Sequence, residues 1–340
     1  MGVVIDFIEL VLGRRRSQVP GPRTRMPFAV FDEAAFGASL AHLDLAKATD
    51  VLLLGGQFAA TCLPYGDDRR TAARLAMQAH PDAAWILCFD SDGYIREAAL
   101  RRLNSPAETT GRLVALTLRL NDWVPQVRQQ AVEAFRRVWP LTPPGVIAGA
   151  VPYLLRQRFI WRRWTHEGNC IDELLGDASV AAEVILLLLH GRSGSLGRTL
   201  AQALRFPVYD PALAKLALEA RLPDVRATAM KTIMQGEAVW PIGHGWAWID
   251  KTMGVRRRIT LTERRSVSAP EPPDLLKAGI ADRSALVRKV AAAVAVERMN
   301  NIPDITEIVA VLANDRSAAV RDRADYIRRH LGSPKGLAGS

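Results

Sequence analysis

The chain has 340 residues, 49% of them hydrophobic and 24% charged, and its 45 Lys and Arg exceed its 35 Asp and Glu to give a net charge of +10. This composition is typical of a folded globular protein and excludes a disordered chain. Cys62, Cys88 and Cys170 are far apart and form no CxxC pair. Their spacing argues against a disulfide framework or a zinc knuckle and favours a reducing cytoplasm.

Residues 1–27 are expected to form an amphipathic helix and a linker. The apolar residues that share one helical face are Val4, Phe7, Ile8, Val11 and Leu12. Asp6 and Glu9 interrupt the apolar run, so we expect no signal peptide and a helix that docks on the core. The less favoured alternative is contact of residues 1–16 with an anionic membrane surface. No later segment offers about 20 uninterrupted apolar residues, so no transmembrane helix is expected.

A short motif then recurs along the chain. An Asp is followed by an Arg six residues later, a β-branched residue precedes the Arg, and an Ala follows it by three. The complete copies pair Asp90 with Arg96, Asp122 with Arg128, Asp282 with Arg288, and Asp315 with Arg321. A fifth copy keeps Arg226 but has Ala220 in the Asp position. Spacings of 32 and 33 residues between successive Arg residues indicate stacked helix pairs.

The residue types of the motif suit that stacking. An Asp in the turn can accept a backbone N–H at the start of the second helix. The β-branched residue points inward, and the Ala lets neighbouring helices approach closely. The Arg can bridge turn carboxylates within or between units. The motif's Asp and Arg residues are therefore predicted to be structural.

These residues resemble HEAT repeats, whose units carry an Asp in the inter-helix turn and a Val-Arg at the start of the second helix. The short units are similar to the HEAT-like repeats of prokaryotic proteins, and the clear copies cover about 75–140 and 272–331. The resemblance implies an all-α fold, a right-handed α-solenoid of HEAT-like helix pairs. We expect a first solenoid block at 28–235, a C-terminal block at 274–331 and a disordered tail at 332–340.

The repeat pattern breaks first at 151–168, where Arg and Trp residues alternate. The candidate binding residues there are Arg156, Arg158, Trp161, Arg162, Arg163 and Trp164. Arg beside aromatic rings is typical of surfaces that bind phosphates and stack bases. The alternative is that the rings pack into the adjacent repeat while the Arg stems cover their edges.

The second break is the segment 236–273, which is long for a connection between helices. Its sequence RRITLT alternates as a strand does, which is compatible with a small β-hairpin. The candidate binding residues are Trp246, Trp248, Arg256, Arg257, Arg258, Arg264 and Arg265. We interpret the segment as an insertion rather than a lost repeat. Two hypotheses remain open: an insert held against the solenoid by its tryptophans, and an arm that binds a partner.

No catalytic residue, metal site or cofactor is predicted. The histidines form no HExxH motif. His166-Glu167 is a single pair, whereas the HEAT-like deoxyhypusine hydroxylases need several to hold two irons. The sequence GRSGSLGR at 191–198 lacks the Lys-Ser/Thr of a phosphate-binding loop and indicates a turn between helices.

The sequence therefore predicts a non-enzymatic scaffold whose curved surface and insertion bind a macromolecule, with a protein favoured as the partner. The alternative is a nucleic-acid-binding HEAT-like protein, consistent with the net positive charge. One version of it is a resemblance to HEAT-like DNA glycosylases, which line a basic cleft with Trp and Asp. The residues that could form such a cleft are Asp122, Trp123, Trp161 and Trp164.

Overall fold

The computed structural model of this chain describes residues 31–331, apart from 65, 67, 159, 162 and 164–168 and the side chains of 56–61 and 169. The helix and linker expected in 1–27 and the tail at 332–340 lie outside the described residues, as do Arg162 and Trp164. Within the described range, no helix combines the length and the apolar character that crossing a membrane requires.

The described residues are predominantly helical, which confirms that part of the prediction, and they also form one two-stranded antiparallel sheet. The α-helices are α2 (Glu33–Leu45), α3 (Val51–Cys62), α4 (Arg69–Ala79), α5 (Ala83–Leu87), α6 (Gly93–Arg102), α7 (Thr110–Leu118), α8 (Pro125–Val138), α9 (Pro144–Gln157), α10 (Asn169–Gly176), α11 (Ala178–His190), α12 (Leu196–Ala203), α13 (Leu213–Glu219), α14 (Pro223–Gln235), α15 (Leu275–Ile280), α16 (Ala285–Glu297), α17 (Ile305–Ala313) and α18 (Ala318–Leu331). Short 3-10 helices are η2 (Arg119–Asn121), η3 (Trp139–Leu141), η4 (Pro207–Ala212) and η5 (Met299–Asn301). The strands are β1 (Glu237–Asp250) and β2 (Val255–Ser266).

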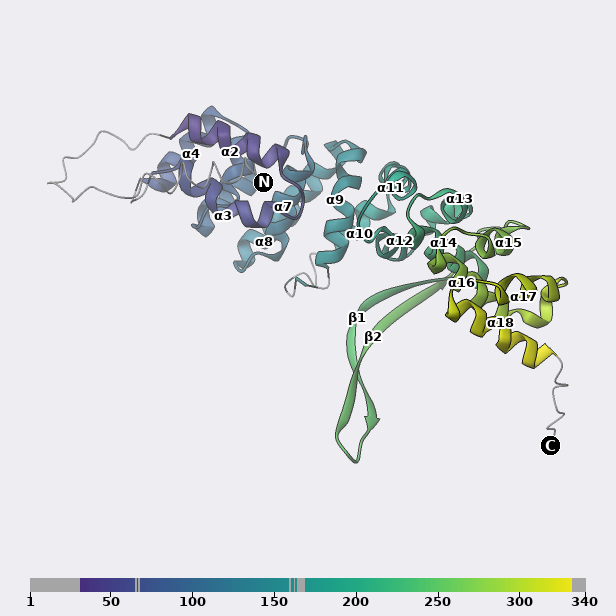
Figure 1. Ribbon diagram of the computed structural model, residues 1–340. Coiled ribbons are helices and arrows are strands. Elements are labelled where there is room, and N and C mark those ends of the chain that lie inside the picture. The colour runs from purple at the N-terminus through teal and green to yellow at the C-terminus, as the bar shows by residue number, and fades with distance from the viewer. Residues whose placement is uncertain are drawn as a thin grey trace.

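The helices lie in two rows along an elongated body (Figure 1). In one row α5, α7, α9, α11, α13, α15 and α17 follow one another, each packed against the next. In the other row α4, α6, α8 and α10 form one run of neighbours, and α12, α14, α16 and α18 form another. Consecutive helices therefore alternate between the two rows.

Helix α8 illustrates how the sequence sets these elements. Pro125 occupies its first turn, where the missing N–H would have no partner inside the helix. One face carries the buried residues Val127, Ala131, Ala134, Phe135 and Val138. Arg136 and Arg137 lie in the last turn, where positive charge complements the helix dipole.

The motif's apolar residues belong to a continuous core. The β-branched residue before the Arg is at most 2% exposed in every copy, and the Ala three residues after it is 0% exposed. The members of these two sets are Ile95, Val127, Val225, Val287 and Val320, and Ala99, Ala131, Ala229, Ala291 and Ala324. Interiors packed this tightly are sensitive to added volume, so the Ala position restricts what can replace it.

Motif Arg residues reach from one unit to the Asp of the next. The bidentate pairs are Arg96 with Asp122 at 2.9 and 2.9 Å, Arg226 with Asp282 at 2.8 and 2.9 Å, and Arg288 with Asp315 at 2.6 and 3.1 Å. Two parallel N–H···O bonds to one carboxylate are the strongest form of this contact. The Arg96–Asp122 pair is the most buried of the three, with side chains 3% and 1% exposed. Asp122 also accepts a hydrogen bond from Arg119 at 3.0 Å.

The same Arg residues also hold the turn of their own unit. In all five copies Nη1 donates to the backbone oxygen six residues earlier, at 2.8 to 3.0 Å. In the fifth copy that acceptor is the backbone oxygen of Ala220, so this contact does not depend on the side chain at that position. Each motif Asp accepts the N–H two residues later, at 2.7 to 3.0 Å. That N–H belongs to the residue that precedes the helix, so the Asp orders the turn instead of capping the helix's first turn.

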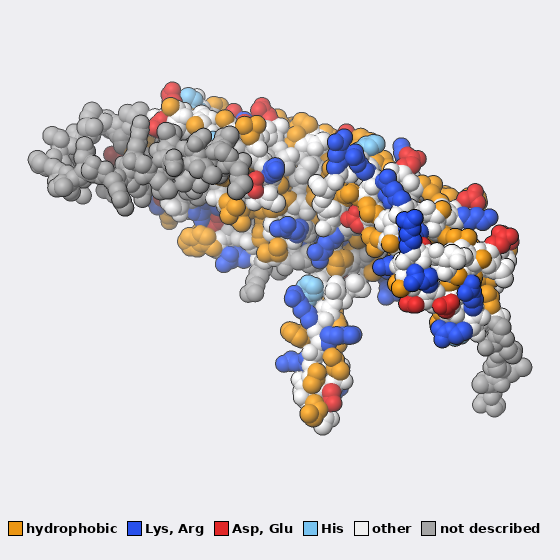
Figure 2. All heavy atoms as spheres, viewed as in Figure 1, with side chains coloured by type: hydrophobic (Ala, Val, Ile, Leu, Met, Phe, Trp, Pro, Cys, Tyr) orange, Lys and Arg blue, Asp and Glu red, His pale blue; other side chains and the backbone are white. Residues whose placement is uncertain are grey.

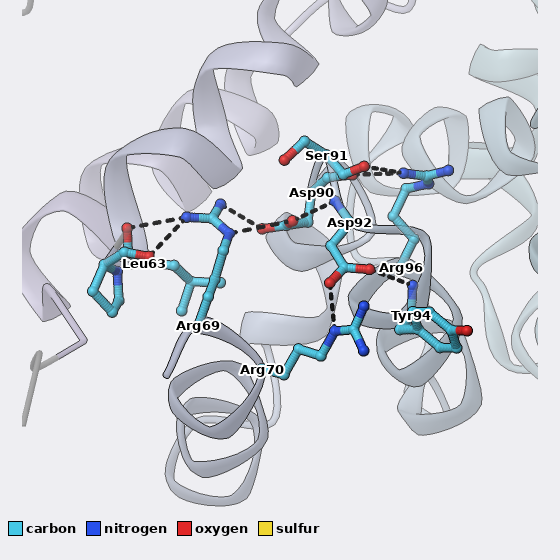
Figure 3. A network of polar contacts seen from close by, with 9 residues as sticks. Leu63, Arg69, Arg70, Asp90, Ser91, Asp92, Tyr94 and Arg96 are labelled. Atoms are coloured by element: carbon cyan, nitrogen blue, oxygen red, sulfur yellow. Dashed lines mark hydrogen bonds and ion pairs between the residues drawn. The ribbon is translucent and has the colours of Figure 1, made fainter. Parts of the chain in front are cut away.

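A sixth member of this series was not predicted. Arg69 in α4 binds the carboxylate of Asp90 at 2.7 and 3.5 Å and donates to the backbone oxygens of Leu63 and Pro64 (Figure 3). These backbone acceptors lie six and five residues before the Arg, as in the other copies. Asp68 replaces the β-branched residue, and the surviving sequence signal is Ala72, three residues after the Arg. The contact pattern therefore begins one unit earlier than the motif.

The sheet is a long hairpin that leaves the body after α14. Gly236 ends that helix with φ +66°, a left-handed conformation that favours glycine. Strands β1 and β2 pair antiparallel from Glu237 opposite Ser266 to Asp250 opposite Val255, with register shifts at Ile242 and Ile249. Figure 1 shows the hairpin projecting from the inner side of a bend in the row of helices. Since Arg226 and Asp282 bond directly, the helices on either side of the hairpin stack as neighbours.

Candidate functional site

The base of the hairpin is part of the folded body. Ala238 is fully buried and Trp240 is 7% exposed. The indole N–H of Trp240 donates to Glu263 at 3.2 Å across the strand pair. Arg265 donates two hydrogen bonds to the carboxylate of Asp210 in η4, at 2.5 and 2.9 Å, and a third to the backbone oxygen of Leu204. These contacts fix the direction in which the hairpin leaves the body.

Two further contacts hold the base. Gln202 of α12 donates from Nε2 to the backbone oxygen of Pro241 at 2.7 Å. The guanidinium of Arg205 lies 6.0 Å from the ring centre of Trp240 and 3.5 Å from Asp172. Burial lowers the pKa of Arg205, as does the charge of Arg158, while Asp172 and Glu263 oppose the change. The hairpin base therefore joins α10, α12 and η4 in one polar cluster.

Beyond Gly243 the hairpin has two different faces. Residues opposite each other in an antiparallel pair point to the same side, and successive residues alternate. The register places His244 opposite Thr260, Trp246 opposite Arg258 and Trp248 opposite Arg256 on one side. The other side carries Gly243 opposite Leu261, Gly245 opposite Ile259 and Ala247 opposite Arg257. We call these the Trp/Arg face and the aliphatic face.

The Trp/Arg face presents large aromatic surfaces to solvent. Trp246 is 65% exposed and Trp248 is 51% exposed. The guanidinium of Arg256 lies 4.9 Å from the ring centre of Trp248, within the range of a cation–π contact. Arg258 is also exposed, directly across from Trp246. The face therefore alternates flat rings with positive charge.

On the aliphatic face, β1 carries small residues and β2 carries large side chains. Leu261 is exposed, and a side chain at Gly245 would approach it to within 3.2 Å. The side chain of Leu261 therefore lies over Gly245 on the opposite strand. Toward the tip, the exposed apolar residues are Ile249, Met253 and Val255. Figure 2 shows hydrophobic and basic side chains together along the projecting hairpin.

The tip is an ordered turn, and most charged residues near it are basic. The carboxylate of Asp250 accepts the N–H groups of Thr252 and Met253, at 2.8 and 3.0 Å. Gly254 has φ +68°, which closes the turn into β2. Between 243 and 262 this Asp is the one acidic residue in the sequence, whereas the basic residues are Lys251, Arg256, Arg257 and Arg258.

The segment 151–168 is divided between packing and surface. Trp161 is buried and meets Tyr153 edge to face, with ring centres 6.3 Å apart. Arg158 forms a bidentate pair with Asp172 at 2.6 and 3.0 Å. Trp161 is therefore packed inside the body, and the ion pair ties Arg158 to α10. Arg156 and Arg163 are exposed, and the backbone N–H of Arg163 donates to the side chain of Asn121 at 3.1 Å.

Of the predicted hairpin residues, the structure groups Trp246, Trp248, Arg256 and Arg258 on one face. Arg257 lies on the opposite face, and Arg264 is nearer the base, 3.4 Å from Glu237. Arg265 belongs to the anchoring contacts. Sequence reasoning missed Gln202, Arg205 and Asp210, because each lies more than 20 residues from the strand that it holds.

The described residues hold no cluster of three or more His, Cys, Asp or Glu side chains suited to a metal ion. Asp122, the acid considered for a glycosylase-like cleft, is bound by Arg96 and Arg119 and is buried. Its contacts are those of the repeat motif. No protein-family model matches this chain, and no curated protein matches it.

Proposed function

We propose that this chain is a non-enzymatic scaffold, a right-handed α-solenoid of HEAT-like helix pairs that binds a partner protein through the distal half of its hairpin. The two rows of helices support the solenoid, because each helix packs against the next member of its own row. The recurring Arg–Asp pairs between successive units support it further. A stack of units with a projecting arm has the extended surface that such scaffolds use.

One observation carries the binding role: the distal hairpin exposes two tryptophans although the hairpin base buries a third. A tryptophan held in water needs a reason, since burying its surface is strongly favourable. Trp and Arg are the side chains most enriched at the energetic centres of protein interfaces. The Trp/Arg face therefore has the composition of a protein-binding surface.

The aliphatic face favours a protein over a nucleic acid. Ile249, Met253, Val255 and Leu261 are exposed on or beside it. Aliphatic side chains bury well against a protein surface, whereas nucleic-acid affinity rests chiefly on phosphate contacts. An arm that served only phosphates would gain little from these residues.

Nucleic-acid binding is the second candidate, and the Arg256–Trp248 contact favours it. Single-stranded nucleic acids bind to surfaces that combine stacking rings with positive charge. Such binding would weaken steeply as salt rises, because each neutralised phosphate releases a counterion. Binding of a protein through the aliphatic face would respond much less to salt.

A cytoplasmic location is part of the proposal. Cys62, Cys88 and Cys170 are buried and form no disulfide. Burial raises the pKa of both Cys88 and Cys170 to about 12. Thiols held in this way act as small core residues.

The test places a photo-crosslinking residue at Met253, which is 74% exposed at the tip, in the full chain expressed in its host. The captured partner is then purified and titrated against the chain. Binding should be lost in Trp246→Ala/Trp248→Ala and retained in Trp123→Ala, since Trp123 is 68% exposed outside the hairpin. Capture of RNA or DNA would support the second candidate. Equal binding by wild type and the double variant would overturn the proposed site.

A further inference from the structure

A cavity of about 430 Å³ lies away from the hairpin tip, between the α2–α3 turn, α9 and α12. Its polar rim is formed by Lys47, Thr49, Arg156, Ser195 and Arg198. Small-molecule sites in proteins commonly have volumes of about 300–1,000 Å³. The proposed partner-binding surface uses none of these residues.

Positive charge converges on this cavity from three separate segments. Lys47 comes from the turn after α2, Arg156 from the last turn of α9 and Arg198 from the first turn of α12. No acidic residue is among the described residues that line it. The neighbouring Asp50 accepts the hydroxyl of Thr49 at 3.0 Å and is not part of the lining. The lining charges therefore favour an anion.

On the α12 side, the cavity is lined by a glycine and by two residues with hydroxyl groups. Gly194 and Ser195 precede α12, and Gly194 has φ +92° with no atom near the position of a Cβ. The positive start of α12 is already partly compensated, because the backbone N–H of Gly197 in its first turn donates to the carboxylate of Asp224 at 2.8 Å. Ser195 and Thr199 line the same cavity. The glycine-rich turn at 191–198 thus contributes to a site although it lacks a phosphate-loop sequence.

The floor of the cavity is buried and partly apolar. Gln202 is 1% exposed, and its Nε2 donates to Pro241, whereas its Oε1 has no hydrogen-bond partner among the described residues. An occupant that donates a hydrogen bond would satisfy this oxygen. Burial raises the pKa of Tyr153, with Gln157 and Arg156 opposing the change, so its hydroxyl stays protonated near neutral pH. Pro152 and Leu155 supply the apolar wall.

We propose that this cavity binds a small organic phosphomonoester, with its phosphate held by Lys47 and Arg156. Arginine forks match phosphate oxygens in a bidentate manner, and lysine adds a point charge. The volume exceeds what a phosphate alone would fill, and the apolar wall suits the rest of the molecule. A hydroxyl on that molecule could donate to the Oε1 of Gln202.

The test titrates the full chain with adenosine 5′-monophosphate and with inorganic phosphate by calorimetry and tryptophan fluorescence, since Trp161 contacts Tyr153. We expect one site for the monophosphate, with affinity reduced about tenfold or more in Arg156→Gln and in Lys47→Gln, because charge-assisted bonds are lost. Arg192→Gln is the matched control, because Arg192 is exposed in the same turn and does not line the cavity. It should bind as the wild type does. No binding of either phosphate at millimolar concentration, or equal loss in the control, would overturn the proposal.

Two more measurements distinguish this cavity from a lipid-binding surface and from the hairpin. Vesicles containing phosphatidic acid offer the same phosphate chemistry from a lipid, and binding to vesicles alone would overturn the assignment to a small molecule. The variant Trp246→Ala/Trp248→Ala should bind the monophosphate as the wild type does, whether or not the hairpin binds a protein. Loss of the monophosphate in that variant would contradict a separate site.

Discussion

The guanidinium of Arg226 donates two hydrogen bonds, at 2.8 and 2.9 Å, to the carboxylate of Asp282, which lies 56 residues later in the chain. The whole hairpin is contained in those residues. The pair is nearly buried, with the Arg side chain 4% exposed and the Asp side chain 12% exposed. We call the packing of one unit on the next a joint. The joint between α14 and α16, which the hairpin interrupts in the sequence, therefore has the same Arg–Asp pair as the joints without an insertion.

Breaking this joint should destabilise the body. We expect Asp282→Ala to reduce the free energy of unfolding by about 3–5 kcal/mol, because it leaves a buried guanidinium without its counter-charge. Arg226→Met/Asp282→Leu should cost clearly less than the sum of the single changes, as no lone charge remains. Urea denaturation followed by circular dichroism measures both. The exposed pair of Arg298 and Glu271 is the control, and Arg298→Met should cost below about 1 kcal/mol.

Acid should weaken the joints in a defined pH range. The hydrogen bond from Arg288 lowers the pKa of Asp315 more than burial raises it. Burial raises the pKa of Asp282, but its hydrogen bonds from Arg226 and the N–H of Ser284 outweigh that effect and the net pKa is lowered. A carboxylate with a lowered folded-state pKa contributes stability above its unfolded value of about 3.9, and that stability is lost as the pH falls toward the folded pKa.

The corresponding measurement is the melting temperature between pH 7 and pH 3. The wild type should change little down to about pH 4 on this account and then fall. Asp315→Asn should start lower and fall less steeply, because it has no carboxylate to protonate at that joint. Parallel curves for the two proteins would mean that Asp315 contributes nothing to the acid dependence.

The hairpin tryptophans should separate into two classes. Trp240 is a core residue, so Trp240→Ala should cost about 3–5 kcal/mol of unfolding free energy. Trp246→Ala and Trp248→Ala should each change it by no more than about 0.5 kcal/mol, because both rings are mainly in water. Chemical denaturation of the three variants compares them directly. A large loss for Trp246→Ala would show that its ring packs in the folded protein.

Shortening the hairpin should preserve the body if the cut is made above the anchoring contacts. Replacing 242–261 with Asn-Gly joins Pro241 to Thr262, which are opposite each other in the strand pair, through a turn suited to antiparallel strands. The helical signal and the cooperative melt should persist, since Trp240 and Arg265 keep their partners. Replacing 237–266 as a whole should lower the melting temperature, because it removes both. If the shorter cut alone unfolds the protein, the distal hairpin contributes to the core.

The helical body could be predicted largely from the motif, because each of its residue types has a defined physical role. Val127 and Ala131 are buried as their places in the motif predict, and Arg96 bridges units as its neighbourhood of turn carboxylates suggests. Arg69 was missed because Leu63 stands in the Asp position of the motif and Asp68 in the β-branched position, although its acceptors are of the same kind as those of Arg96.

The candidate surfaces were harder to predict, because exposure depends on partners far away in the chain. Arg158 and Arg265 have the same sequence character as Arg156 and Arg256, yet Asp172 and Asp210 bind them in the folded body. The three hairpin tryptophans differ for a similar reason, as contact with the body buries Trp240 alone. The composition identified the two segments that depart from the repeat. It could not show which of their residues hold the segment to the body and which are exposed.

The closed base of the hairpin also makes it a natural graft site. Val267 donates its backbone N–H to Gly236 at 2.9 Å, so the chain leaves and re-enters the body at adjacent positions. Any two-stranded element with that end spacing could replace the distal hairpin while Arg226 still reaches Asp282. Lengthening a flexible loop costs only about 0.6 kcal/mol for each doubling. Arms of different length and sequence could therefore diversify on one unchanged body, whether by natural insertion or by design.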